Sequence, residues 1–179
     1  MSRPLKLEGG MADLGRWGGL VIVDRRHLAV VTKAARREEF DVPEDWAGPG
    51  VIGLGGWLFE DTGIVLAMGV TGTIVVVVAL LVPEVVNEVV LERDPNRRFR
   101  VSAWSSSGDD ALLLWERGLA RFDSTGACRW TVMHEDGTAG FDTVTADAVW
   151  IKGQSGDARR DRRRGYRLAD GSRLSDPEE

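Results

Sequence analysis

Residues 110–130 read DALLLWERGLARFDSTGACRW, and this stretch decides the fold that we predict for the chain. It contains three short runs rich in apolar residues, at 111–116, 119–123 and 128–133, separated by turns with glycine and aspartate. Glycine and aspartate favour turns because they reach backbone conformations that most other residues avoid. Short strands separated by closely spaced turns are typical of antiparallel all-β folds.

A second copy of this pattern begins at Asp147, 37 residues after Asp110. The segment DALLLW is matched by DAVWI, and after an insertion GLARFDSTG is matched by GYRLADG. A period of about 40 residues with four short strands is the size of one β-propeller blade. The repeat therefore predicts blade-like sheets in the C-terminal part of the chain.

The stretch from Leu119 to Trp130 resembles the blade repeat of quinoprotein-type (PQQ-like) β-propellers. With its second copy, the resemblance covers the C-terminal third to half of the chain. In that family an Asp/Gly turn joins two strands of a blade, and the closing tryptophan packs between neighbouring blades. The resemblance therefore implies a turn at Asp123 and Gly126, and a packing position for Trp130.

The second copy keeps the turn at Asp170 and Gly171 but has Leu174 in place of the tryptophan. The segment Asp61-Thr62-Gly63 is a third match, without a closing tryptophan. The chain matches no set of quinone ligands, so the resemblance implies no cofactor.

Residues 62–83 contain no charged side chain. About 20 apolar residues would be enough to cross a bilayer as a helix. The runs at 64–68 and 73–82 are instead dominated by Val, Ile and Thr, which favour strands. The link at 69–72 begins and ends with glycine, and acidic residues flank the whole segment. We therefore predict a buried hairpin here, with a membrane span as the alternative.

The fold class that follows is all-β, with short antiparallel strands in a small or partial β-propeller or a sandwich. Further strands are expected at 20–23, 28–32, 57–59, 85–92, 99–104, 141–144 and 148–152, with loops at 33–45, 48–56 and 105–110. We expect a single β-rich domain over residues 1–174. Within it, an N-terminal part at 1–104 precedes propeller-like repeats at 105–174, and a disordered tail at 175–179 follows.

The chain has 179 residues, 43% of them hydrophobic and 28% charged, with a formal net charge of −5. This is an ordinary globular composition. A single cysteine excludes a disulfide scaffold and fits a reducing compartment. The first eight residues lack the apolar run of a signal peptide, and arginine far outnumbers lysine, a bias typical of GC-rich genomes. We expect a cytoplasmic bacterial protein.

Local patterns that could indicate chemistry each have a simpler explanation. The glycines at 48–53 have dinucleotide-loop spacing but lack the preceding strand and following helix. His134-Glu135-Asp136 is better explained as a polar hairpin turn, because adjacent strand residues point to opposite faces. His27 lies in a charged turn, and Cys128 is expected to be a buried structural thiol. We therefore predict no catalytic residue, no metal and no cofactor.

Two groups of residues remain as candidates for binding. Five arginines could contact phosphates or an acidic protein, or simply be a solvated insertion: Arg159, Arg160, Arg162, Arg163 and Arg164. Trp17 and Trp46 lie in glycine- and proline-rich surroundings and would be interface anchors if exposed. The tryptophans at 115, 130 and 150 are expected in the core or between blades.

These features favour a non-catalytic interaction module that binds another protein, or a second copy of itself. Binding would use strand edges and the tryptophans and arginines above. The alternative is a nucleic-acid-binding protein that uses the arginine-rich loop 159–164. No membrane partner is expected.

Overall fold

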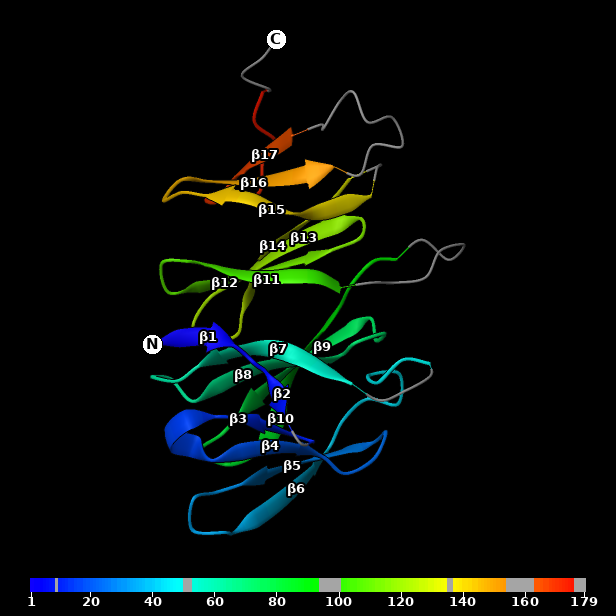
Figure 1. Ribbon diagram of the computed structural model, residues 1–179, viewed down its shortest axis with the longest axis vertical. Coiled ribbons are helices and arrows are strands. Elements are labelled where there is room, and N and C mark those ends of the chain that lie inside the picture. Colours follow the sequence, from blue (N-terminus) through cyan, green and yellow to red (C-terminus); the bar gives the residue numbers. More distant parts are fainter. Residues whose placement is uncertain (9, 50–52, 94–100, 135–136, 154–162, 176–179) are drawn as a thin grey trace. The chain divides into compact units, whose positions relative to one another are not determined.

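The computed structural model describes residues 1–8, 10–49, 53–93, 101–134, 137–153 and 163–175 (Figure 1). These residues form four antiparallel sheets and one short 3-10 helix, η1 (Gly15–Trp17). The predicted all-β class is therefore confirmed. The chain divides into two compact units: unit 1 is Met1–Arg93 with Ser124–Gly126, and unit 2 is Asp94–Asp123 with Ala127–Glu179.

Unit 1 contains two five-stranded sheets. Sheet 1 has the order β2 (Leu7–Glu8), β3 (Met11–Asp13), β4 (Gly19–Ile22), β5 (His27–Val31) and β6 (Arg37–Asp41). Sheet 2 has the order β1 (Ser2–Pro4), β7 (Leu54–Phe59), β8 (Ile64–Gly69), β9 (Ile74–Ala79) and β10 (Glu84–Val90). Strands β3–β6 and β7–β10 each form an antiparallel meander.

Unit 2 contains a four-stranded and a three-stranded sheet. Sheet 3 has the order β11 (Val101–Ser107), β12 (Asp110–Trp115), β13 (Gly118–Phe122) and β14 (Cys128–Met133). Sheet 4 has the order β15 (Thr138–Val144), β16 (Ala148–Gly153) and β17 (Arg163–Arg167), and an isolated bridge joins Tyr166 to Arg173. Successive antiparallel meanders of this kind are the strand topology of propeller blades.

One hydrophobic core holds the two sheets of unit 1 together. Leu28 and Val30 of β5 belong to it, as do Val76 and Val78 of β9. In each strand the core residues are two apart, because alternate side chains point to the same face of a sheet. Trp46, from the segment between β6 and β7, lies inside this core and is 0% exposed.

The N-terminal residues add one strand to each sheet of unit 1. β1 pairs antiparallel with β7, and β2 pairs antiparallel with β3. The Leu5 N–H donates to the Gly56 carbonyl at 2.9 Å, and Arg3 donates to the Asp13 carboxylate at 3.1 Å. These strands were not predicted, because runs of two or three residues are too short to show a periodic pattern.

The predicted internal repeat is present in unit 2 with the same strand register in both copies, but the predicted match of Gly118 with Gly165 is wrong, because the pairing aligns Gly165 with Ala120. Three cross-strand pairs of sheet 3 correspond to three of sheet 4: Ala111–Phe122, Leu113–Ala120 and Trp115–Gly118 to Ala148–Arg167, Trp150–Gly165 and Lys152–Arg163. The two sheets share a core to which β12 contributes Leu112 and Leu114, and β16 contributes Val149 and Ile151.

The predicted hairpin within residues 62–83 is confirmed. β8 and β9 pair antiparallel, and their central residues are buried. Within the part of the chain that the structure describes, no helix is long and apolar enough to cross a membrane.

Three predicted loops are wrong in part. Residues 33–45 include the strand β6, whose mostly charged sequence hides its pairing with β5. The glycine-rich segment 48–56 includes the start of β7 at Leu54, so Gly55 and Gly56 are strand residues. The predicted loop at 105–110 is a tight hairpin, because β11 continues to Ser107 and β12 begins at Asp110.

The division into units lies at Arg93 and Asp94, before the boundary at residue 104 that the sequence suggested. The turn Ser124–Gly126 belongs to unit 1, where the Thr62 hydroxyl donates to the Ser124 carbonyl at 2.7 Å. Of the predicted disordered tail, residues 176–179 lie outside the described residues.

Candidate interaction surfaces

The outermost strand of sheet 2, β10, carries exposed apolar side chains. Val86 is 50% exposed and Val90 is 70% exposed, and Leu81 and Val82 are exposed in the turn that leads into the strand. We call these four residues with the strand itself the β10 edge. An edge strand presents backbone N–H and C=O groups that have no partner in its own sheet. The β10 edge can therefore offer both hydrogen bonds and apolar contacts.

Charged residues and a bulge also lie along β10. Glu84 and Glu88 are exposed, and the register with β9 shifts between Val85 and Asn87. Charges and bulges are the features by which natural edge strands limit indiscriminate pairing. The β10 edge is therefore suited to a selective partner.

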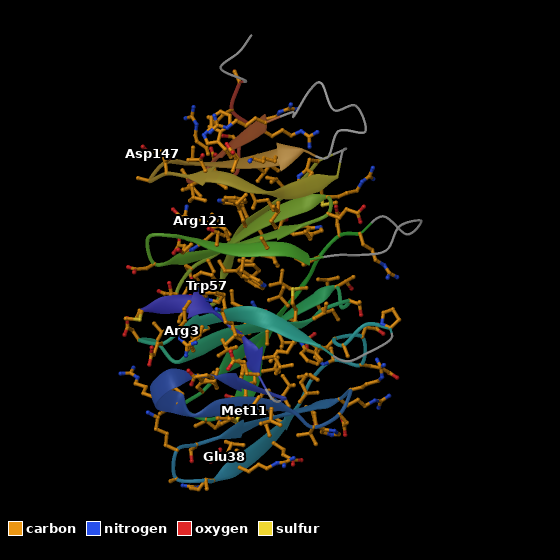
Figure 2. All side chains as sticks on the ribbon, in the orientation of Figure 1. Arg3, Met11, Glu38, Trp57, Arg121 and Asp147 are labelled. Carbon is orange, nitrogen blue, oxygen red and sulfur yellow. The ribbon has the colours of Figure 1, made fainter. Side chains whose placement is uncertain are left out.

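The face of sheet 1 turned away from the unit 1 core, which we call the sheet-1 outer face, has an apolar centre. Cross-strand pairing places Met11, Val21 and Ala29 in one row. Met11 is 45% exposed (labelled in Figure 2) and its side chain lies directly over Gly19, where a Cβ would collide with its sulfur. Val31 pairs with Gly19 and completes this centre.

Acidic residues border the sheet-1 outer face. By pairing and alternation the acidic members are Glu8, Asp13, Glu39 and Asp41. Arg37 and His27 lie on the same face: Arg37 forms an ion pair with Glu39 at 2.7 Å, and the His27 Nε2 lies 3.2 Å from Asp41. Arg3 of β1 forms an ion pair with Asp13 at 3.1 Å. The sheet-1 outer face is therefore negatively charged overall.

The face of sheet 4 turned away from the unit 2 core, the sheet-4 outer face, is built around Trp150. The indole lies over Gly165, its cross-strand partner, where a Cβ would be 2.6 Å from the ring. The Arg163 guanidinium lies 4.7 Å from the centroid of the Trp150 ring, within range of a cation–π interaction.

Basic residues surround Trp150. Lys152, Arg163 and Arg167 are all exposed on this face. Asp142 accepts ion pairs from Arg163 at 2.7 Å and from Lys152 at 3.5 Å. A register shift between Phe141 and Thr143 allows Asp142 to reach this side of the sheet. Three cations around one described carboxylate make the sheet-4 outer face positively charged.

The structure buries one predicted interface tryptophan and half-buries the other. Trp46 is fully buried, and its Nε1 donates to the Ala67 carbonyl at 3.4 Å, so the expectation of an exposed anchor is wrong. Trp17 in η1 packs against the unit 1 core, and its Nε1 donates to the Glu60 carbonyl at 2.9 Å. Both indoles hold unit 1 together.

The predicted arginine loop is partly a strand. Arg159, Arg160 and Arg162 lie outside the described residues. Arg163 and Arg164 are the first two residues of β17, so their assignment to the loop is wrong. Alternation places Arg163 on the sheet-4 outer face, whereas Arg164 is only 7% exposed.

The turn glycines singled out by the resemblance have the same backbone conformation in sheets 3 and 4, but the aspartates are not equivalent, because Asp123 directly follows β13 and Asp170 lies three residues after β17. Gly126 and Gly171 have φ angles of 82° and 73°, in the left-handed region that favours glycine. The Asp123 carboxylate accepts the Ala127 N–H at 3.1 Å, and the Asp170 carboxylate accepts the Ser172 N–H at 2.9 Å.

Trp130 contacts the corresponding turn of sheet 4. Its Nε1 donates to the Leu168 carbonyl at 2.8 Å, and its ring lies against Gly171. Arg121, labelled in Figure 2, donates to the same carbonyl oxygen. The third match, at 61–63, also turns at a left-handed glycine, Gly63, but joins the first two strands of its meander and not the last two.

The isolated titratable residues occupy structural positions. His27 lies between two carboxylates, with Nδ1 2.8 Å from Asp24 and Nε2 3.2 Å from Asp41. His134 is buried directly after β14, and Glu135 and Asp136 lie outside the described residues. Burial raises the pKa of the half-buried Cys128 thiol, which lowers its reactivity. Among the described residues, no three His, Cys, Asp or Glu side chains are grouped so that they could hold a metal ion.

No protein-family model matches the chain, and no curated protein sequence is significantly similar to it. Among solved structures it is similar to the WD40 domain of Pan2 from Neurospora crassa, with 13% identity over 88% of this chain and 48% of that chain and a TM-score of 0.44. It is also similar to Hsv2 from Kluyvelomyces marxianus (12% identity, 83% and 48% coverage, TM-score 0.49). A third similarity is to BamB from Moraxella catarrhalis (11%, 76% and 40%, TM-score 0.39).

The chain spans about half the length of these proteins or less. All three TM-scores are below 0.5, so the fold description rests on the strand topology of the chain itself.

Apart from Arg163, the residues that form the outer faces were not predicted from the sequence. Trp150 was predicted in the core or between blades, whereas its ring lies half-buried on the sheet-4 outer face. The signal that could have found it is the alternation in 148–152, where Val149 and Ile151 face the core and Lys152 shares the face of Trp150.

Proposed function

We propose that the protein is a non-catalytic, cytoplasmic interaction module that binds another protein, or a second copy of itself. The β10 edge carries this proposal. Its binding chemistry is strand addition, in which a partner strand pairs with the edge of a sheet and places its side chains against the exposed ones.

The apolar side chains of β10 support this role. Val86 is the extra residue of the bulge between Val85 and Asn87, and Val90 lies four residues further along the strand. Two valines exposed to water do not stabilise the folded chain. Their burial would be favourable by about 25 cal/mol per Å² of apolar surface. A partner that covered them would recover that free energy.

The test compares captured proteins between variants of the full chain. A tagged wild-type protein and the variant Val86→Lys/Val90→Lys are purified from the source cells, and bound proteins are quantified by mass spectrometry. Lysine on an edge strand opposes strand addition, because the ammonium group would have to be desolvated against the partner. We expect at least about tenfold less of the specific partner with the double variant.

Val70→Lys is the matched control. Val70 is 52% exposed in the link between β8 and β9 and is not part of β10. A second, differently tagged copy of the chain in the same cells reports self-association. The proposal is overturned if all three proteins capture the same set, or if wild type enriches neither a specific protein nor the second copy.

A further inference from the structure

We infer that the sheet-4 outer face of one chain docks onto the sheet-1 outer face of a second copy. This inference rests on the proposed function, since it names a second copy of the chain as a partner. It uses surfaces different from the β10 edge, so the two proposals can fail separately.

Both outer faces have a complementary apolar centre. Met11 lies over Gly19 on sheet 1, and Trp150 lies over Gly165 on sheet 4. In each case a glycine lets a large, partly exposed side chain lie flat on the sheet. Such a side chain presents a broad apolar surface, and tryptophan and methionine are both enriched in the centres of protein interfaces.

The charges around these centres are opposite. The sheet-1 outer face has four carboxylates with Arg37 and His27, and Arg3 of β1 pairs with one of these carboxylates, Asp13. The sheet-4 outer face has three cations and one carboxylate: Lys152, Arg163 and Arg167 with Asp142. Opposite charges attract the two faces toward each other, and like charges oppose pairing of either face with itself. The interaction is therefore heterologous.

The repeat shows what a covered face of this kind looks like. In sheet 3, the positions equivalent to Trp150, Lys152 and Arg167 are Leu113, Trp115 and Phe122, which are all at most 1% exposed. In sheet 4 the same positions are partly or fully exposed. A partner on the sheet-4 outer face would bury these positions there too.

Each chain carries one basic and one acidic outer face, so a first contact between two copies leaves one basic and one acidic face uncovered. Two copies close if each binds the other through both faces, and a longer assembly forms if they do not close. In either case the molecular mass is a multiple of 19.6 kDa.

Charge reversal of the purified full chain tests the inference. The basic-face variant is Lys152→Glu/Arg167→Glu, and the acidic-face variant is Glu39→Lys/Asp41→Lys. Each is measured alone, and then as an equimolar mixture, by size-exclusion chromatography with light scattering over a concentration series. Absorbance is recorded at 260 and 280 nm, in low and in high salt.

Wild type is expected at a multiple of 19.6 kDa. Each variant alone has two outer faces of like charge, so its self-association is expected to weaken by about tenfold or more. In the mixture, the reversed face of each variant matches the reversed face of the other, and the two native faces also match. The mixture should therefore regain the wild-type mass, and high salt should weaken the wild-type assembly.

Two control variants carry the same changes of charge at residues that lie outside the strands. Lys6→Glu/Lys33→Glu matches the basic-face variant, and Asp45→Lys/Asp109→Lys matches the acidic-face variant; all four residues are exposed. Both controls should keep the wild-type mass, and circular dichroism should show the same fold for every variant.

The inference is overturned if wild type stays monomeric, if both reversed variants keep its mass, or if the mixture fails to restore it. Monomeric wild type with absorbance at 260 nm that the basic-face variant lacks would instead assign the sheet-4 outer face to nucleic acid. Val86→Lys/Val90→Lys in the same assay separates the two proposals. If it dissociates the assembly while both charge-reversed variants keep it, the β10 edge proposal stands and this inference fails.

Discussion

Sheets 3 and 4 are two copies of one pattern that differ on a single face. The core-facing pair of β12, Leu112 and Leu114, corresponds to Val149 and Ile151 of β16, and all four lie in the same hydrophobic core. The opposite faces differ in polarity. Leu113, Trp115 and Phe122 in sheet 3 correspond to Trp150, Lys152 and Arg167 in sheet 4.

This difference separates a sheet buried on both faces from a sheet buried on one. β12 is almost continuously buried, whereas β16 alternates between buried and exposed residues. Unit 1 shows the same contrast, because β9 is a nearly unbroken buried run and β6 alternates. A strand covered on both faces has a continuous apolar sequence, and a strand covered on one face alternates.

Exchanging residues between the equivalent faces of sheets 3 and 4 should give the largest change in the free energy of unfolding. Phe122→Arg places a charge at a position that is 0% exposed, so we expect it to lower the free energy of unfolding by more than about 4 kcal/mol. The reciprocal change, Arg167→Phe, should change it by less than about 0.5 kcal/mol. Urea unfolding measures both, and equal losses would mean that the two faces are not different in kind.

Adding a methyl group to the glycine under Trp115 or Trp150 should give a smaller difference in the free energy of unfolding between the two sheets. A Cβ at Gly118 collides with the fully buried Trp115, whereas one at Gly165 meets the half-buried Trp150. Trp115 has no room to move, so Gly118→Ala should cost about 1–3 kcal/mol. Trp150 can shift toward solvent, so Gly165→Ala should cost less than about 1 kcal/mol. The same unfolding titration tests this, and the reverse order would contradict it.

Removing the indole donor that contacts the turn of sheet 4 should have a modest effect. Trp130→Phe loses the hydrogen bond from Nε1 to the Leu168 carbonyl, worth about 1 kcal/mol. Amide hydrogen exchange should become faster at Gly171 and Ser172. Trp17→Phe is the matched control, because it removes the bond to Glu60 in unit 1 and should leave those two amides unchanged.

Removing the charge of Asp170, in the turn after β17, should give the smallest change in stability. Hydrogen bonds from the Ser172 side chain and backbone lower the pKa of Asp170 below its ordinary value of 3.8. The charged form is thus favoured in the folded chain, and its stabilisation is present above the unfolded pKa and lost as the pH falls through the folded one.

The variant Asp170→Asn should therefore unfold slightly more easily than wild type at pH 6, and this difference should shrink as the pH falls below the ordinary carboxyl pKa of 3.8. Thermal unfolding across that range measures it, with Asp109→Asn as an exposed control in another turn. A difference that stays constant with pH would assign the effect to something other than the carboxylate charge.

Much of the strand pattern could be predicted, because many strands are long enough to show their apolar residues and are bounded by turn residues. β8, β9 and β12–β14 follow this rule. β6 was missed because four of its five residues are charged, and it is a strand only through pairing with β5. The candidate surfaces were predicted less well, since whether Trp46 or Trp150 is buried depends on residues distant in the sequence.

The alternation of β-branched runs and turns is enough to specify an all-β chain with a repeat, because strand propensity and turn chemistry are local properties. Local properties also predict which residues of β16 share a face, since neighbouring side chains point to opposite sides. They do not say which face is covered. The burial of Trp46, the strand partners of β1 and β2, and the opposite charges of the two outer faces arise only when distant segments pack together.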